Sequence, residues 1–236
     1  MPLVVRLRSA VCLLGRFPAL AGVDLDVAPG ETVLLSGGNG AGKTTLLRMV
    51  AGLLPLHQGE GEVLGVDLAH DRRSHRSRLG FVGQETFCYD DLTVRENLRF
   101  ATRAAGGSTH DADEALEALE LVRLAGVRHG RLSTGQRRRL GLAVAIARRP
   151  ELFLLDEPHA GLDAPGRAYL TDVLTRASAD GRSVLIASHE LDLVRPSVTR
   201  EVVLTNGQAH GALDGGGAPA TVDPPAPAPR QALERT

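Results

Sequence analysis

The stretch TVLLSGGNGAGKTT, residues 32–45, decides the fold of this chain. Residues 32–38 form a continuous apolar run that ends in glycines, which is typical of a strand buried on both faces of a sheet. Residues 43–53 have the apolar spacing of a helix. A strand that leads through a glycine-rich loop into a helix predicts an α/β fold. The loop then lies at the carboxyl edge of a mostly parallel sheet, where such folds bind ligands.

The loop itself matches the phosphate-binding pattern G-x-x-x-x-G-K-[ST] in the strand–loop–helix context that the pattern requires. Lys43 is expected to reach the β- and γ-phosphates of a nucleotide, and the Thr44 hydroxyl to bind Mg²⁺. Lys43 is also the only lysine in the chain, and a compact ammonium is not replaceable by a planar guanidinium in a tight site. A glycine-rich helix cap would need neither side chain. The nucleotide-binding residues expected here are Gly37, Gly38, Asn39, Gly40, Ala41, Gly42, Lys43, Thr44 and Thr45.

Three other apolar runs end in polar side chains that suit chemistry at the same edge of the sheet. LFLLDEP, residues 152–158, ends in two carboxylates. Asp156 suits a Mg²⁺ contact, and Glu157 is placed to polarise an attacking water as general base. His189 ends the run SVLIASH and is expected to contact the γ-phosphate. Gln84 ends RLGFVGQ and is expected to contact Mg²⁺ or the attacking water. Taken alone, Asp-Glu-Pro could form a turn, and the histidine could have a purely structural role. Gln84 alone is a weak signal.

Residues of about 85–135 have a helical pattern without strand signals, and they interrupt the α/β pattern. Thr93 with Glu96, and Ser133 with Gln136, have the three-residue spacing of capping boxes. The segment LSTGQRRRLGLAV therefore begins a helix, and the segment alone leaves open whether that helix N-terminus also binds an anion. After Gly211 the chain is rich in glycine, alanine and proline. We therefore expect one domain over 1–211 and a disordered tail over 212–236.

The composition excludes some classes of partner. The net charge of −1 gives no electrostatic case for nucleic acid, so no nucleic-acid partner is expected. No apolar run reaches the roughly 18 residues that a membrane helix needs, so no direct insertion into a membrane is expected. The two cysteines, Cys12 and Cys88, lack metal-ligand spacing and are compatible with a reducing compartment.

The order of these motifs resembles that of the ATP-binding cassette ATPases over roughly residues 3–210. The resemblance implies a P-loop fold with a mostly parallel core sheet, an antiparallel β subdomain and an inserted helical arm that carries the signature LSTGQ. It implies ATP and Mg²⁺ as ligands, ATP hydrolysis, and a head-to-tail dimer, formed with a second copy or a paired cassette subunit, that sandwiches ATP. It also implies that Ser133, Gly135 and Gln136 bind the ATP held by the partner, and that Asp163 contacts that partner.

Three positions depart from the family pattern. Thr134 replaces the first glycine of the signature, and Gly38 stands where the phosphate-binding loop often has proline. The third departure concerns the base: Leu14 occupies the place of the aromatic residue that stacks on adenine, with Phe17 nearby. We therefore expect weak base stacking and poor discrimination between ATP and GTP, unless Phe17 takes the role.

A cassette without a membrane span resembles the nucleotide-binding subunit of a transporter, which implies an integral membrane permease as partner. The protein would then lie in the cytoplasm, on the inner face of the membrane. We expect docking beside the Gln84 loop, in the segment 85–93, where the apolar residues are Phe87, Tyr89 and Leu92. Among such subunits, the chain resembles the haem exporter ATPase of bacterial cytochrome c maturation. The alternative is a soluble cassette ATPase that acts as a scaffold, as in iron–sulfur cluster assembly. A nucleotide-gated binding module is disfavoured because Glu157 is present.

Overall fold

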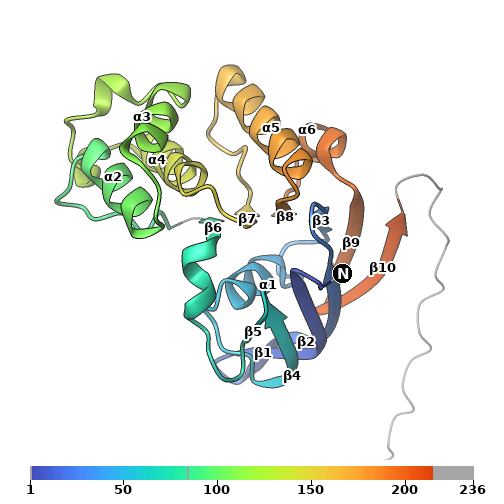
Figure 1. Ribbon diagram of the computed structural model, residues 1–236. Coiled ribbons are helices and arrows are strands. Elements are labelled where there is room, and N and C mark those ends of the chain that lie inside the picture. The colour runs from blue at the N-terminus through green and yellow to red at the C-terminus, as the bar shows by residue number, and fades with distance from the viewer. Residues whose placement is uncertain (1, 84, 215–236) are drawn as a thin grey trace, which may run out of the picture.

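A six-stranded sheet forms the centre of the molecule (Figure 1). The computed structural model describes residues 2–83 and 85–214. The strand order is β10-β9-β3-β8-β7-β6, in which all neighbours are parallel except the β9–β10 pair. The strands are β3 (Thr32–Ser36), β6 (Leu79–Val82), β7 (Leu152–Asp156), β8 (Ser183–Ala187), β9 (Arg200–Thr205) and β10 (Gln208–Asp214). Because β3, β7 and β8 are parallel, the loops that follow them meet at one edge of the sheet.

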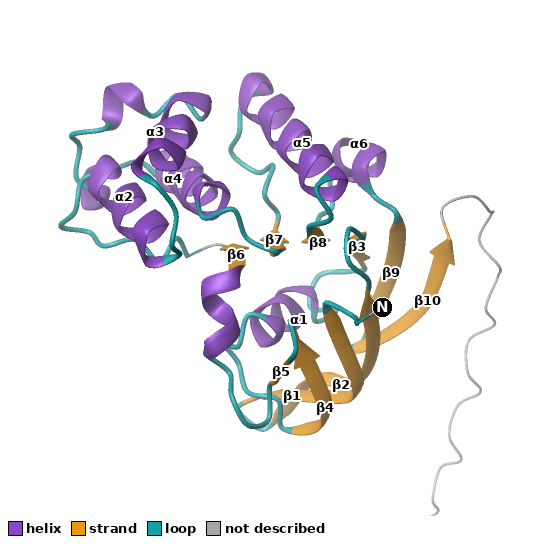
Figure 2. Cartoon of the chain, viewed as in Figure 1, coloured by secondary structure: helices purple, strands orange, loops and turns teal. Residues whose placement is uncertain are grey.

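A second, antiparallel sheet of four strands lies on the other side of helix α1 (Figure 2). Its order is β2-β1-β4-β5, and its strands are β1 (Val5–Leu14), β2 (Phe17–Val27), β4 (Gln58–Val63) and β5 (Val66–Asp67). Helix α1 (Lys43–Val50) begins directly after the glycine-rich loop and buries Leu46, Leu47 and Met49. These side chains share one apolar core with both sheets, so the loop before α1 is fixed from both sides.

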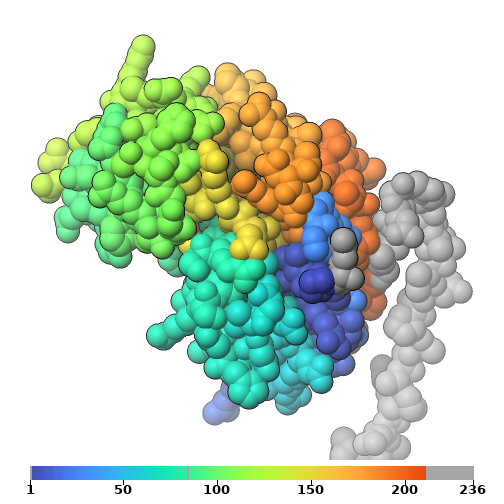
Figure 3. All heavy atoms as spheres, in the orientation of Figure 1, coloured from blue at the N-terminus to red at the C-terminus, as the bar shows by residue number. Residues whose placement is uncertain are grey.

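The remaining α-helices lie on the other side of the central sheet (Figure 1). Those of the arm are α2 (Val94–Ala104), α3 (Thr109–Ala118) and α4 (Thr134–Ala147), and α5 (Ala164–Ala179) and α6 (Leu191–Val194) follow later in the chain. The short 3-10 helices are η1 (Ser74–Arg78), η2 (Val122–Leu124), η3 (His129–Arg131) and η4 (Arg195–Ser197). The arm forms a lobe that projects beside the sheet, as the green surface in Figure 3 shows. A second apolar core joins α4 and α5 to the sheet.

The predicted fold class is confirmed: an α/β P-loop architecture with a mostly parallel core sheet, an antiparallel subdomain and a helical arm. Asn206-Gly207, a residue pair typical of two-residue hairpins, forms the turn between β9 and β10, with positive φ angles of 50° and 75° that suit a type I′ turn. Strand β10 continues to Asp214, so residues 212–214, expected in the tail, belong to the sheet; residues 215–236 lie outside the described part. Among the described helices, none has the length and apolar character needed to cross a bilayer.

Candidate functional site

The glycine-rich loop between β3 and α1 has a backbone that side chains would disrupt. Gly37 has φ of 133°, and a Cβ atom there would collide with the carbonyl oxygen of Leu204. Gly42 has φ of 107°, and its Cβ would lie 2.8 Å from the carbonyl oxygen of Ala19. Lys43 Nζ donates hydrogen bonds to the carbonyl oxygens of Gly37 (2.7 Å) and Gly38 (3.0 Å). The ammonium therefore already lies over the loop, where the phosphates of a nucleotide bind.

The Thr44 hydroxyl and the Asp156 carboxylate come together although they are far apart in the sequence. Thr44 Oγ1 donates a hydrogen bond to Asp156 Oδ2 at 2.8 Å. Asp156 ends β7, is 6% exposed, and is held by the pairing of β7 with β8. A hydroxyl and a carboxylate are oxygen ligands of the kind that Mg²⁺ prefers, so this pair fits a Mg²⁺ site. Gln84, the third residue expected at this site, lies outside the described residues.

Glu157 and His189 form an ion pair at the same edge. Glu157 follows β7 in a left-handed conformation with φ of 51°, and its N–H donates to the carbonyl oxygen of Ala187 at 2.8 Å. His189 Nδ1 lies 2.9 Å from Glu157 Oε2. The hydrogen bond to this carboxylate raises the pKa of His189 above its ordinary value. A carboxylate and an imidazole thus lie together beside the phosphate-binding loop.

Lys43, Thr44, Asp156 and Glu157 line a cavity of about 350 Å³, whereas Gly37, Gly38 and His189 are not among its lining residues. It is lined by Leu14, Ala19, Asn39, Gly40, Ala41, Gly42, Lys43, Thr44, Thr45, Arg138, Asp156 and Glu157. Leu14 is therefore beside the nucleotide site, whereas Phe17 is not among the lining residues and is 80% exposed. Arg138 was not anticipated from the sequence, because nothing distinguishes it from Arg137 and Arg139 within the run of three.

The signature residues lie elsewhere in the same chain. Ser133 caps α4: its Oγ accepts from the Gln136 N–H at 3.3 Å, and Gln136 Oε1 accepts from the Ser133 N–H at 3.0 Å. Asp163 caps α5 by accepting from the Gly166 N–H at 3.1 Å. Ser133, Gly135, Gln136 and Asp163 are absent from the lining of the described nucleotide cavity. Within one chain the structure does not bring them to the phosphate-binding loop, so their contact with a partner's ATP stays a prediction.

Residues 20–160 match the ABC transporter family. The chain belongs to this family, and it is an ATP-binding subunit that hydrolyses ATP. The resemblance indicated by its motifs is thereby confirmed. The assignment of individual site residues stays a prediction from the motifs and the geometry.

Relatives with named roles lie within this family. The chain is 40% identical over 185 residues to the cytochrome c biogenesis ATP-binding export protein CcmA of Bordetella bronchiseptica, which covers 78% of this chain and 83% of that protein. It is 35% identical over 215 residues to the sulfate/thiosulfate import ATP-binding protein CysA of Caulobacter vibrioides, covering 87% and 63% respectively. Among solved structures, a dimeric post-hydrolysis state of the cassette MJ0796 with ADP and Pi superposes with a TM-score of 0.80 at 26% identity, covering 91% of this chain and 100% of that one.

Proposed function

We propose that the chain hydrolyses ATP with Mg²⁺ inside a head-to-tail dimer and drives a separate membrane subunit in an export step of cytochrome c biogenesis. The observation that supports the hydrolytic part is that Glu157 and the Thr44–Asp156 pair line one cavity, while His189, outside the lining, contacts the Glu157 carboxylate. Thr44 and Asp156 would hold Mg²⁺, and Gln84 is proposed as a further ligand. When bound, Mg²⁺ neutralises charge on the phosphate oxygens.

Lys43, Glu157 and His189 have separate roles in the proposed reaction. Lys43 exchanges the carbonyl oxygens of Gly37 and Gly38 for phosphate oxygens, which are stronger acceptors. Glu157 accepts a proton from the attacking water, as its carboxylate stands at the open edge of the sheet. His189 holds that carboxylate through Nδ1 and contacts the γ-phosphate. The partner's Ser133, Gly135 and Gln136 complete the site through the positive N-terminus of α4. The dimeric state of the cassette MJ0796 supports this arrangement.

Glu157→Gln tests the hydrolytic assignment. The amide cannot accept the proton, whereas the cavity and the phosphate-binding loop are unchanged, so hydrolysis should fall by a factor of about 10² or more while ATP binding persists. The variant should accumulate an ATP-bound dimer, measured by size-exclusion chromatography with Mg²⁺ and ATP. The matched control is Glu117→Gln, an exposed carboxylate on α3. Normal hydrolysis by Glu157→Gln would show that another group is the base.

The membrane subunit is proposed to dock in a second cavity, of about 250 Å³, between η1 and the helical arm. Phe87 and Tyr89 line it and are 59% and 55% exposed, and Tyr89 packs edge-on against Phe100 with ring centroids 5.3 Å apart. Arg76 and Arg148 line it as well, and no carboxylate pairs with either within the described chain. We therefore propose as occupant a short helix of the membrane subunit with an apolar face and one carboxylate.

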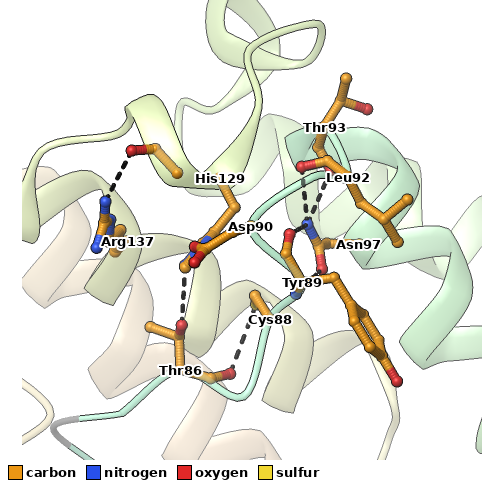
Figure 4. Close-up of polar contacts among 10 residues, drawn as sticks. Thr86, Cys88, Tyr89, Asp90, Leu92, Thr93, Asn97, His129 and Arg137 are labelled. Atoms are coloured by element: carbon orange, nitrogen blue, oxygen red, sulfur yellow. Dashed lines mark hydrogen bonds and ion pairs between the residues drawn. The ribbon is translucent and has the colours of Figure 1, made fainter.

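Two buried polar side chains hold residues 86–93 of the docking segment 85–93 in place (Figure 4). Asn97 of α2 is 3% exposed; its Oδ1 accepts from the Tyr89 N–H at 2.8 Å, and its Nδ2 donates to carbonyl oxygens of the segment, including that of Leu92 at 3.1 Å. His129 of η3 contacts the Thr86 hydroxyl at 2.9 Å and the Asp90 carboxylate at 2.7 Å. Leu92 is not among the lining residues of the cavity, so its expected contact with the permease has less support than those of Phe87 and Tyr89.

His129 also connects the docking segment to the signature. Its backbone N–H donates to the Leu92 carbonyl oxygen at 2.9 Å, and the Gly130 N–H donates to that of Asp90 at 3.1 Å. Ser133 lies two residues beyond the end of η3. A permease helix that displaces residues 86–93 would therefore displace the N-terminus of α4, which offers a physical route from transport to the ATP site.

The export step is proposed from the relatives named for cytochrome c biogenesis in Bordetella bronchiseptica and Rhodospirillum rubrum, at 40% and 36% identity. Through its partner, the protein would lie on the inner face of the cell membrane. Isolation of the native complex tests this proposal against a scaffold ATPase. A polytopic membrane protein in the complex supports transport, and an assembly with only water-soluble partners overturns it. Tyr89→Asp should release the membrane partner without loss of ATP binding, because it places a charge in the docking cavity.

A further inference from the structure

Arg138 is a cation of the signature helix that reaches the nucleotide cavity of its own chain. It lies in the second turn of α4, downstream of Ser133, and its side chain lines the cavity with Lys43, Asp156 and Glu157. The guanidinium Nη2 donates a hydrogen bond to the Glu157 carbonyl oxygen at 2.7 Å and lies 3.4 Å from that of Asp156. The helix that is expected to serve a partner's ATP therefore also contacts the hydrolytic edge of its own subunit.

The environment of Arg138 indicates a specific role for this contact. No carboxylate forms an ion pair with Arg138 in the described part of the chain, so its hydrogen bonds to the main chain of residues 156 and 157 are the contacts that fix its guanidinium. Neighbouring guanidiniums are used differently: Arg137 donates to the Gly130 carbonyl oxygen, and Arg139 pairs with Asp163. The short hydrogen bond of the half-buried Arg138 guanidinium goes to the main-chain carbonyl of Glu157. A hydrogen bond from a charged donor restricts the movement of that carbonyl.

The carbonyl that Arg138 holds belongs to the proposed catalytic residue in an uncommon backbone conformation. Glu157 has φ of 51°, a region that residues with a Cβ atom adopt at a cost, so surrounding contacts are needed to maintain it. On one side, the Glu157 N–H is bonded to Ala187 of β8. On the other side, its C=O accepts a hydrogen bond from Arg138 of the arm at 2.7 Å and a longer one, at 3.2 Å, from the Ala160 N–H of the following turn. The direction of the Glu157 carboxylate toward His189 depends on both.

We infer that Arg138 is a positioning residue for hydrolysis: from the helical arm of the same subunit, it fixes the main chain of Glu157 and so makes the placement of the catalytic carboxylate depend on the position of the arm. This inference rests on the proposed role of Glu157 as the base. It assigns the signature helix two tasks, one at its N-terminus toward the partner's ATP and one in its second turn toward its own Glu157.

Arg138→Met tests the inference, because methionine keeps an apolar stem of similar reach and removes both the charge and the donors. We expect kcat to fall by about tenfold or more, since small displacements of a catalytic group have effects of that size, while KM for ATP stays within about twofold. Arg138→Lys should restore most of kcat, because an ammonium can donate to the same carbonyl. The control is Arg149→Met, which removes a guanidinium just beyond α4 that pairs with Asp111 and Glu114, and it should hydrolyse ATP normally.

The outcomes separate this inference from the proposed function. If the natural chain and Arg149→Met hydrolyse ATP, Glu157→Gln does not, and Arg138→Met keeps its full kcat, the inference is wrong and the proposed function stands. A rise in KM with unchanged kcat overturns it too, because Arg138 would then bind nucleotide directly. Failure of the natural chain to hydrolyse ATP overturns the proposed function itself. If Arg138→Met unfolds, Arg138→Gln replaces it, and a kcat equal to that of the natural chain again contradicts the inference.

Discussion

Replacing Leu14 by tryptophan should strengthen nucleotide binding, because it supplies the aromatic face that the site lacks. Leu14 ends β1, lines the nucleotide cavity, and is 49% exposed. Stacking of a base on an aromatic ring contributes ~1–3 kcal/mol. Since Leu14 already offers an apolar surface and half of it faces solvent, the net gain should lie near the lower bound, ~1 kcal/mol, or about fivefold in Kd. The opposing position across the hairpin is Phe17, and an aromatic pair is tolerated there.

The assay uses the absence of tryptophan from the natural chain, so that fluorescence of Leu14→Trp reports from the nucleotide site alone. Calorimetry gives Kd for ATP and GTP in the natural chain and in the variant. We expect both nucleotides to bind about fivefold tighter to the variant, because every base has a face for stacking. The natural chain should discriminate little between them. Phe17→Ala is the control and should change neither Kd. A natural ATP preference above about tenfold, an unchanged Kd in Leu14→Trp, or weaker binding by Phe17→Ala would refute the reasoning.

Three other predictions follow from contacts at the site and in the arm. Ser133→Ala removes the α4 cap and should lower the free energy of unfolding by ~1 kcal/mol, whereas Ser133→Gly should lower it by only a few tenths of that. Both variants should lose ATP hydrolysis and keep ATP binding. Normal hydrolysis by either variant would refute the signature role. The pKa of His189 is raised in the folded chain by Glu157, so the stabilisation from this pair is complete below the unfolded value of 6.5 and is lost as pH rises through the higher folded pKa. Glu157→Gln should return the His189 pKa, followed by NMR titration, toward 6.5, and an unmoved titration would contradict the ion pair. Asn97→Ala leaves the Tyr89 N–H without its acceptor and removes the Asn97 Nδ2 hydrogen bonds to the carbonyl oxygens of Tyr89, Leu92 and Thr93. It should lower the free energy of unfolding by ~2 kcal/mol, measured by urea denaturation; a change below about 0.5 kcal/mol would contradict its bracing role.

Patterns with a fixed local geometry could be predicted from the sequence. Four features lie where their sequence patterns indicate: the phosphate-binding loop, the carboxylates at the end of β7, the capping boxes at Thr93 and Ser133, and the Asn206-Gly207 turn. Each depends on residues within a few positions of one another, so the sequence states the constraint directly.

Contacts between distant segments could not be predicted in this way. Arg138 has the same type and sequence environment as its two neighbours, and only the packing of α4 against the sheet directs it to Glu157. The short strands β4 and β5 carry few apolar residues, and their pairing, β4 with the edge of β1 and β5 with β4, has no signal in their own sequence. Asn97 and His129 read as ordinary arm residues, since their partners are main-chain and side-chain atoms of a loop with no regular pattern.

The Ser133 cap at the start of α4 affects whether the helix end stays intact when the dimer opens and closes. A serine hydroxyl has one proton to donate and two lone pairs to accept. In the described chain, the Ser133 oxygen only accepts, from the Gln136 N–H, and its own proton is free. A phosphate oxygen of the partner's ATP could accept a hydrogen bond from that hydroxyl while the cap to the Gln136 N–H stays in place. Assembly and release of the sandwich would then leave the helix end intact, so repeated turnover need not fray the signature.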